Sequence, residues 1–304
     1  MATRQISLFD TFLMLALITF WGSSFVVVKI ALGEGLTPIA IATFRFLTAG
    51  GLFIIALLVE KNRKHDYRLL VERKDIPTLL ILAFTGITFF FTAQYTGIKL
   101  AGASIAAIFV CLLSPILITI FSTRMFKEYL NKRQIFGIGT AAAGTLIVTV
   151  GGTLSLQFNK EFFLGSLILL STPFLWSAHS LIGKKMTDKY NPFLVVAYVT
   201  VLGGLCLIPF SLAENSLQQI LTMSLNSWLA IIYLSFTCSL LGYYIWFYAM
   251  KKIGAAVTSS FLFAEPLVTV LLAVTLPQIG EKLTVPILAG GLLIFTGVYL
   301  ITKK

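Results

Sequence analysis

Ten apolar stretches of about 20 residues each follow one another along this 304-residue chain, with short polar breaks between them. A helix of that length crosses roughly 30 Å of hydrocarbon. The stretches are continuous rather than alternating with a period of two, so membrane-spanning strands are not indicated. With 58% hydrophobic and 12% charged residues, the composition also lies outside the range of soluble domains. We therefore expect an all-α integral membrane protein with ten transmembrane helices.

The predicted helices divide equally between the two halves of the chain. In the first half they run from Leu8 to Ile30, Pro38 to Val59, Ile76 to Ile98, Ser104 to Thr123 and Arg133 to Val150. In the second half they run from Phe163 to Gly183, Pro192 to Leu212, Asn226 to Met250, Ala256 to Leu276 and Thr284 to Thr302. The first run lacks a small-x-small cleavage site, so we interpret it as a retained helix rather than a signal peptide.

The second half repeats the first at an offset of about 153 residues. Trp21-Gly22-Ser23-Ser24 has its counterpart in Trp176-Ser177-Ala178-His179, and Lys29 and Lys184 each follow the tryptophan by eight residues. A second pattern runs Pro115, Glu128, Leu130, Gly137, Gly144 and again Pro266, Glu281, Leu283, Gly290, Gly297. We expect two five-helix units, residues 1–152 and 153–304. Such duplications are typical of transporters, in which one repeat rocks against the other; a duplication kept for packing alone is the alternative.

Lysine and arginine counts in the breaks predict the orientation. Eighteen of these residues fall at the N-terminus, in the breaks after helices two, four, six and eight, and at the C-terminus, against Lys99, Lys160 and Lys282 on the other side. The side rich in positive charge is cytoplasmic, which places both termini in the cytoplasm. Because each unit holds an odd number of helices, the second unit is expected to be inverted relative to the first, with Glu128 inside and Glu281 outside.

The formal net charge of +11 is explained by the same short loops, which face anionic lipid headgroups, so no nucleic-acid partner is expected. The three cysteines lie in apolar stretches without CxxC spacing, and neither a disulfide framework nor a metal site is predicted. No cofactor is expected. Phosphate-binding loops, HExxH motifs and paired loop carboxylates are absent from the sequence, which argues against an enzyme.

The duplicated Pro, Glu, Leu and Gly pattern resembles that of the EamA-type transporters of the drug/metabolite transporter superfamily. The resemblance covers nearly the whole chain. It implies a ten-helix bundle whose central cavity is lined mainly by helices one, three, four, six, eight and nine and moves small organic solutes, most often outward. Helices five and ten are expected at the periphery, where their glycines allow close packing. The partner in that packing is either another helix of the same chain or a second protomer, so the protein is a monomer or a homodimer.

Few ionisable groups occur inside the predicted helices, and each is costly to bury without a partner. Glu265, which precedes Pro266, is either a proton or cation site that empties during the cycle, or a structural carboxylate paired with a hydroxyl such as Ser259 or Ser260. His179 shares a helical face with Trp176. We favour a place in the cavity lining for it, with proton coupling as a possible role; a buried neutral histidine bonded to backbone is the alternative.

The remaining cations are interpreted as structural. Arg45 lies in helix two, which is not expected to line the cavity, and an arginine at that depth can reach the outer interface. The alternative for Arg45 is that its guanidinium fork attracts an anionic group of the substrate. Lys29 and Lys184 occupy matching positions near opposite ends of the bundle, where each can reach its own headgroup region.

Aromatic side chains indicate the character of the substrate. Tyr243 and Phe247 are expected to share one face of helix eight, and Tyr244 and Tyr248 another. Flat apolar surfaces with a few polar tips suit an aromatic amino acid, a related amphipathic metabolite or a lipophilic cation. The expected substrate-binding residues are Trp21, Ser24, Gln94, Tyr95, Trp176, His179, Tyr243, Tyr244, Trp246 and Phe247, with Glu265 and His179 as coupling candidates.

The sequence therefore predicts a secondary transporter of the cytoplasmic membrane that exports amino acids or related small solutes and contacts membrane lipid. A lipid flippase, a structural membrane subunit and, least favoured, a membrane-embedded transferase are the alternatives.

Overall fold

The computed structural model describes residues 7–63, 69–151, 159–275 and 284–303, and all regular elements within them are helical. Ten spans of the described chain are long and apolar enough to cross a membrane, as the sequence predicts. They are Leu8–Gly33, Pro38–Arg63, Arg73–Ala101, Ile105–Phe126, Lys132–Val150, Lys160–Lys189, Pro192–Ala213, Leu225–Ile253, Ala255–Leu272 and Val285–Thr302. The chain is therefore a multi-pass membrane protein.

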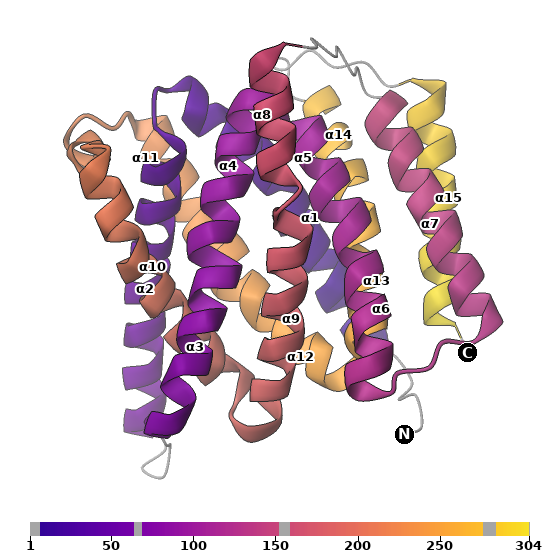
Figure 1. Cartoon of the computed structure of the whole chain (residues 1–304), viewed down its shortest axis with the longest axis horizontal. Helices are drawn as coiled ribbons and strands as arrows, with labels where there is room; N and C mark the ends of the chain where they lie inside the picture. Colours follow the sequence, from indigo (N-terminus) through magenta and orange to yellow (C-terminus); the bar gives the residue numbers. More distant parts are fainter. Residues whose placement is uncertain (1–6, 64–68, 152–158, 276–283, 304) are drawn as a thin grey trace.

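The α-helices that build the first five spans are α1 (Leu8–Gly33), α2 (Pro38–Arg63), α3 (Ile76–Ala83), α4 (Phe89–Ala101), α5 (Ala103–Ala107), α6 (Ser114–Phe126) and α7 (Lys132–Gly151). Those of the second five are α8 (Lys160–Leu169), α9 (Thr172–Lys189), α10 (Pro192–Ala213), α11 (Leu225–Tyr233), α12 (Gly242–Ile253), α13 (Ala255–Ser260), α14 (Glu265–Thr275) and α15 (Val285–Thr302). Figure 1 shows them as a single layered bundle with α7 and α15 at one side.

Several spans are interrupted by segments that are not α-helical, and the interruptions recur in both halves. Spans three and eight contain the π-helical segments Phe84–Thr88 and Leu234–Leu241. Span four contains π-helical Ile108–Leu113, and span nine contains the 3-10 segment Phe261–Ala264. Pro115 and Pro266 are the second residues of the helices that follow, α6 and α14. A proline lacks the backbone N–H that would continue the helical hydrogen bonds from the preceding segment, but it is tolerated in the first turn of a helix.

Matching glycines connect spans three and four and spans eight and nine. Gly102 has φ 91° and Gly254 has φ 94°, in the region that residues with a side chain rarely adopt. The two halves therefore share a tight hairpin at equivalent positions, as expected for a duplicated unit.

The most extensive helix contacts join one half of the chain to the other. They are the contacts of α7 with α15, α2 with α10, α4 with α8, α1 with α14 and α6 with α9. Helix α1 packs on α14 just as α9, the counterpart of α1, packs on α6. These two matching contacts are what an approximate two-fold relation between the halves would produce. The inversion of the second half across the membrane stays a prediction.

The predicted close packing of glycines is found between α7 and α15 of the same chain. A Cβ added to Gly144 would lie 2.6 Å from the carbonyl oxygen of Gly290, and one added to Gly297 would lie 2.6 Å from that of Gly137. Because lipid gives helices no hydrophobic reason to associate, such close backbone contact supplies the dispersion energy that holds the pair. The intrachain interpretation of these glycines is confirmed.

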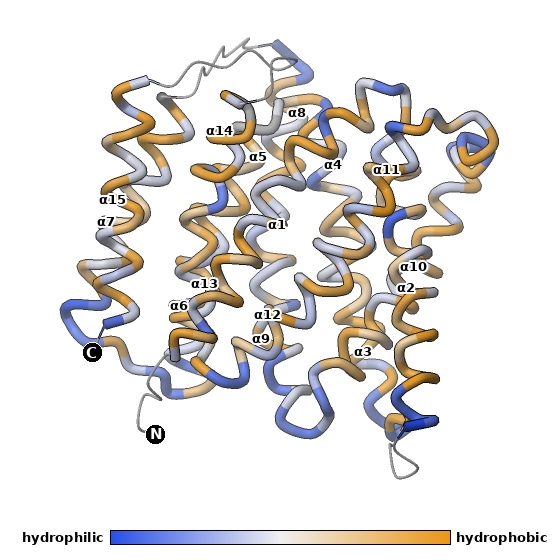
Figure 2. Tube along the Cα trace, turned by 180° about the vertical axis from the view of Figure 1, so that it is seen from behind, coloured by the Kyte–Doolittle hydropathy of each residue, from blue (hydrophilic) through white to orange (hydrophobic). Residues whose placement is uncertain are grey.

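The surface of the bundle has the distribution of polarity that a bilayer requires. Figure 2 shows hydrophobic residues along the middle of the helices and hydrophilic ones gathered toward the ends and loops. The start of α1 and the end of α15 lie at the same end of the bundle (Figure 1).

One predicted helix end is wrong for a physical reason. The sixth span was expected to end at Gly183, before Lys184 and Lys185, but α9 continues to Lys189. Lys184 is buried, with 9% of its surface exposed, and forms an ion pair with Glu128. A buried and paired lysine does not end a helix, and Lys184 is not an anchor at the headgroups.

Candidate functional site

A pocket with a cavity volume of about 40 Å³ lies where the two halves meet. Its lining comes from α1, α2, α4 and span four of the first half and from α9, α12, span nine and α14 of the second: Trp21, Ser24, Phe25, Arg45, Phe90, Phe91, Gln94, Val110, Trp176, Tyr243, Leu262 and Glu265. All six spans expected to line a cavity contribute to it. Span two also contributes, through Arg45, which is a correction of the sequence interpretation.

Aromatic rings form the floor and one wall of this pocket. The rings of Trp21 and Trp176 meet edge to face with centroids 5.3 Å apart, and Tyr243 lies 6.0 Å from Trp21 and 5.8 Å from Trp176. Phe90 lies 5.0 Å from Trp176. Because these rings come from α1, α4, α9 and α12, a relative movement of the two halves changes the shape of the wall.

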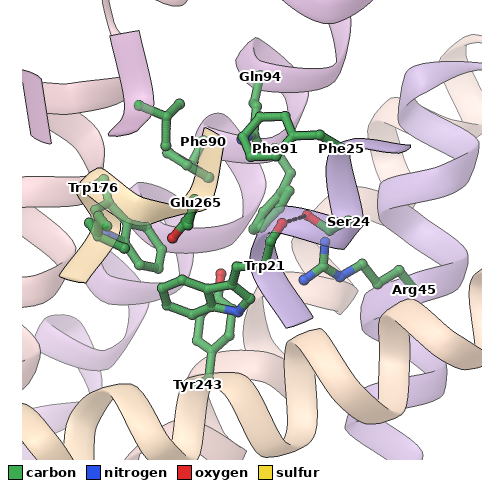
Figure 3. A pocket seen from close by; sticks show the side chains of 12 residues that line it. Trp21, Ser24, Phe25, Arg45, Phe90, Phe91, Gln94, Trp176, Tyr243 and Glu265 are labelled. Atoms are coloured by element: carbon green, nitrogen blue, oxygen red, sulfur yellow. Dashed lines mark hydrogen bonds between the residues drawn. The ribbon is translucent and has the colours of Figure 1, made fainter. Parts of the chain in front are cut away.

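The polar tips of the aromatic residues are held by backbone groups. Trp21 Nε1 donates to the carbonyl oxygen of Cys238 at 2.9 Å, and Tyr243 Oη donates to that of Gly86 at 2.9 Å. Rings fixed in this way offer apolar surface to a ligand with little loss of conformational entropy. Ser24 Oγ donates to the carbonyl oxygen of Trp21, and Ser24 lines the pocket (Figure 3).

Arg45 is a buried side chain of the pocket wall and does not reach the outer interface. Only 2% of its surface is exposed. Its Nε donates to Ser239 Oγ at 2.7 Å and its Nη1 to Tyr95 Oη at 2.6 Å. The guanidinium carbon lies 4.6 Å from the ring centroid of Phe91. Hydroxyl groups and an aromatic face thus hold the cation, and no carboxylate of the described chain forms an ion pair with it.

Glu265 lies at the start of α14 and is 2% exposed. Its Oε2 accepts a hydrogen bond from Cys111 Sγ at 3.3 Å, a weak donor, and within the described residues its Oε1 has no partner. The expected pairing with Ser259 or Ser260 is not found, because those hydroxyls donate to backbone carbonyls one turn back in α13. In the view of Figure 3, Glu265 lies on the Trp176 side of Trp21 and Arg45 lies on the other side.

His179 is fully buried and is not among the residues that line the pocket. Its ring lies behind the aromatic wall, 5.2 Å from Trp176 and 5.7 Å from Tyr243. Nδ1 lies 3.0 Å from the carbonyl oxygen of Leu82, and a carbonyl can only accept, so the proton is on Nδ1. This is the alternative in which a buried histidine is satisfied by backbone, although Nε2 has no partner in the described part of the chain.

The other predicted site residues divide into three groups. Gln94 lines the pocket, whereas Tyr95, Trp246 and Phe247 are buried behind its wall. Tyr244 lies on the opposite face of α12, is 36% exposed and contacts Phe193 and Tyr248. The pairing of faces along helix eight is therefore as predicted, and only the Tyr243 face is turned to the pocket.

A polar cluster closes one end of the bundle, outside the pocket. The carboxylate of Glu128 pairs with Lys184 and accepts hydrogen bonds from the backbone N–H groups of Ala255, at 2.9 Å, and Ala256, at 3.1 Å. Glu128 thus joins the end of span four to α9 and to the first turn of α13. Glu128 and Lys184 both belong to repeated patterns of the sequence, but nothing in those patterns pairs one with the other.

The two halves of the chain each match the same family profile, that of the EamA-like transporter family, over residues 9–150 and 163–303. The chain belongs to the EamA-like transporter family. Its curated relatives include a transporter of Archaeoglobus fulgidus that is 29% identical, with 97% of this chain and 98% of the relative covered. A probable amino-acid metabolite efflux pump of Salmonella typhimurium is 26% identical, with 96% of this chain and 94% of the relative covered.

The EamA-like fold is also found in a solved crystal structure that resembles this chain with a TM-score of 0.75. The two share 19% sequence identity, and the match covers 96% of each chain. The inner membrane transporter YedA of Escherichia coli K12 is 27% identical over 95% of this chain and 89% of its own length. Family and relatives are transporters, which are not enzymes.

Proposed function

We propose that this EamA-like protein is a secondary transporter of the cytoplasmic membrane that exports small organic solutes, with amino acids, related metabolites and amphipathic cations as the candidate class. The observation that carries the proposal is the pocket between the two halves, which is lined by aromatic rings and by two buried ionisable side chains, Arg45 and Glu265. The similarity to the Salmonella relative, a probable amino-acid metabolite efflux pump, supports an amino-acid metabolite.

The proposed cycle is alternating access, in which the halves rock around the pocket so that it opens to one side at a time. Both termini and the end of the bundle that carries Glu128 and Lys184 are assigned to the cytoplasm, because positive charge is concentrated there. Solute in the pocket, lipid around the bundle and a monomeric or dimeric state complete the proposal.

Transport by reconstituted protein tests the function. Purified protein is screened by thermal shift against amino acids, amines, nucleosides and sugars, because a ligand that binds the folded state raises its stability. Hits are then radiolabelled and their counterflow into proteoliposomes is measured. The expected result is counterflow above that of protein-free liposomes for at least one hit, and its absence for all hits contradicts the proposal.

Two variants show whether the pocket is the path. Ser24→Phe adds a ring to a side chain that lines the pocket, and it is expected to abolish counterflow. Tyr244→Phe removes a hydroxyl on the face of α12 turned away from the pocket and is expected to retain the wild-type rate. Equal rates in the two variants would place the transport path elsewhere.

Proton coupling is proposed for Glu265, with His179 as the second candidate. Glu265 lines the pocket and has one carboxyl oxygen without a partner in the described chain, whereas His179 lies behind the aromatic wall. Glu265→Gln is expected to abolish accumulation driven by a pH gradient while downhill exchange of a hit continues. If accumulation still responds to the gradient in this variant, Glu265 is not the coupling group.

A further inference from the structure

Arg45 has hydrogen-bonding capacity that the protein does not use. A guanidinium carries five N–H donors in one plane. Two of its nitrogens, Nε and Nη1, donate to hydroxyls, and Nη2 donates to no acceptor among the described residues. The group is turned from α2 toward Trp21 and Ser24, into the pocket (Figure 3). A cation that is buried within the membrane-spanning helices and has no carboxylate partner can bind an anionic group of a ligand.

Glu265 presents a carboxyl group to the same pocket. One carboxylate oxygen has no partner within the described chain, and the other has a single weak thiol donor from Cys111. The side chain is 2% exposed, so bulk water does not solvate it. Trp176 and Trp21 line the same pocket, and aromatic faces attract an ammonium group through cation–π contact.

Arg45 and Glu265 line one pocket and are not paired with each other, because no ion pair within 4.0 Å joins them. A simple cation meets Glu265 but leaves Arg45 unpaired, and a simple anion does the reverse. Leaving either charge buried without a partner is unfavourable. A ligand with one group of each sign satisfies both side chains and leaves the pocket neutral.

We propose that the pocket recognises zwitterionic amino acids, with Arg45 binding the carboxylate and Glu265 binding the ammonium group. The aromatic wall of Trp21, Trp176 and Tyr243 then receives an apolar or aromatic side chain. This inference rests on the proposed function only in that the same pocket carries the transported solute.

Three compounds with one phenylethyl skeleton test the charge pattern on the wild-type protein in nanodiscs. L-Phenylalanine carries both charged groups, 2-phenylethylamine lacks the carboxylate and 3-phenylpropanoate lacks the ammonium group. Titration calorimetry is expected to give an affinity for L-phenylalanine at least about tenfold higher than for either of the others, because each lost group removes a charge-assisted hydrogen bond. Equal affinity for all three, preference for a singly charged compound, or no binding of L-phenylalanine overturns the inference.

Two variants assign each charge to its residue. In Arg45→Gln, affinity for L-phenylalanine is expected to fall to that for 2-phenylethylamine, whose own affinity does not fall. In Glu265→Gln, affinity for L-phenylalanine is expected to fall to that for 3-phenylpropanoate. If these side chains served only to hold the fold, all three compounds would weaken by the same factor, which is the result that contradicts the assignment. Arg45→Lys, which keeps the charge without the planar fork, is the variant to use if Arg45→Gln does not fold.

The transport assay separates this inference from the proposed function. Counterflow of another solute together with no binding of L-phenylalanine rejects the zwitterion assignment and leaves the transport function standing. Binding of L-phenylalanine with the expected preference, but no counterflow of any compound, supports the assignment and rejects transport.

Discussion

The substitution Gly22→Ala tests whether the close contact of α1 with α14 positions the pocket. A Cβ at Gly22 would lie 2.7 Å from the Cβ of Val268 and 2.8 Å from the carbonyl oxygen of Glu265. Ordinary contacts between carbon atoms are ~3.5–4.0 Å, so the two helices must separate by about 1 Å. The hydrogen bond of Thr269 Oγ1 to the carbonyl oxygen of Gly22, 2.8 Å long, is then stretched or lost.

The expected cost has two parts. Overpacking costs ~1–3 kcal/mol, and the lost hydrogen bond adds ~0.5–1.5 kcal/mol. Alanine is a better helix former than glycine by up to ~1 kcal/mol, which offsets part of this. We expect a net loss of about 1–3 kcal/mol and a Tm lower by about 2–4 °C for each kcal/mol.

Thermal unfolding of the purified protein in detergent, followed by tryptophan fluorescence, measures this shift. Gly51→Ala is the matched control, because Gly51 lies within α2 and a Cβ there meets nothing within 4 Å. Its Tm is expected to equal or exceed that of the wild type. If the Gly22→Ala protein is as stable as the Gly51→Ala protein, close contact between α1 and α14 does not stabilise the fold. The claim that this contact positions Glu265 and the pocket would then be refuted.

Two further predictions concern the ends and the side of the bundle. Gly144→Ala brings a Cβ to 2.6 Å from the carbonyl oxygen of Gly290 and should lower Tm. Gly139→Ala in the same helix is the control and should not lower Tm, because a Cβ there meets nothing within 4 Å. Equal shifts in Tm would contradict the packing of α7 on α15. Glu128→Gln should destabilise the protein by ~1–3 kcal/mol because Lys184 keeps a largely buried charge without its partner, and in a double-mutant cycle with Lys184→Met the two losses should not add. Additive losses would show that the pair is not coupled.

The spans and their packing were accessible from sequence because each depends on a local property. Apolar length predicts a membrane span, and a recurrent glycine predicts close helix contact. The aromatic pocket followed from the tryptophans near the middle of the first helix of each repeat, and five of the ten predicted binding residues line it: Trp21, Ser24, Gln94, Trp176 and Tyr243. Whether they bind substrate stays a prediction.

The predictions for Arg45 and His179 were wrong because they depended on which face of an apolar helix turns toward the pocket. Apart from Thr43 and Thr48, the sequence around Arg45 is apolar, so no continuous polar stripe marked the inner face of α2. His179 was placed in the correct cluster but one layer too close to the pocket, a distance that helical spacing does not resolve. The π-helical segments Phe84–Thr88 and Leu234–Leu241 also change the angular position of the residues that follow them, and no residue pattern announced them.

Accessibility of a cysteine at position 24 from each side of the membrane tests the central claim most directly, that one pocket between the halves opens alternately. Cys111, Cys206 and Cys238 are replaced by alanine, Ser24→Cys is added, and the protein is reconstituted in one orientation. We predict that a membrane-impermeant maleimide labels Cys introduced at Ser24 from either side, and that a transported solute slows both reactions. Labelling from one side alone or from neither, in a variant that still transports, would contradict the account.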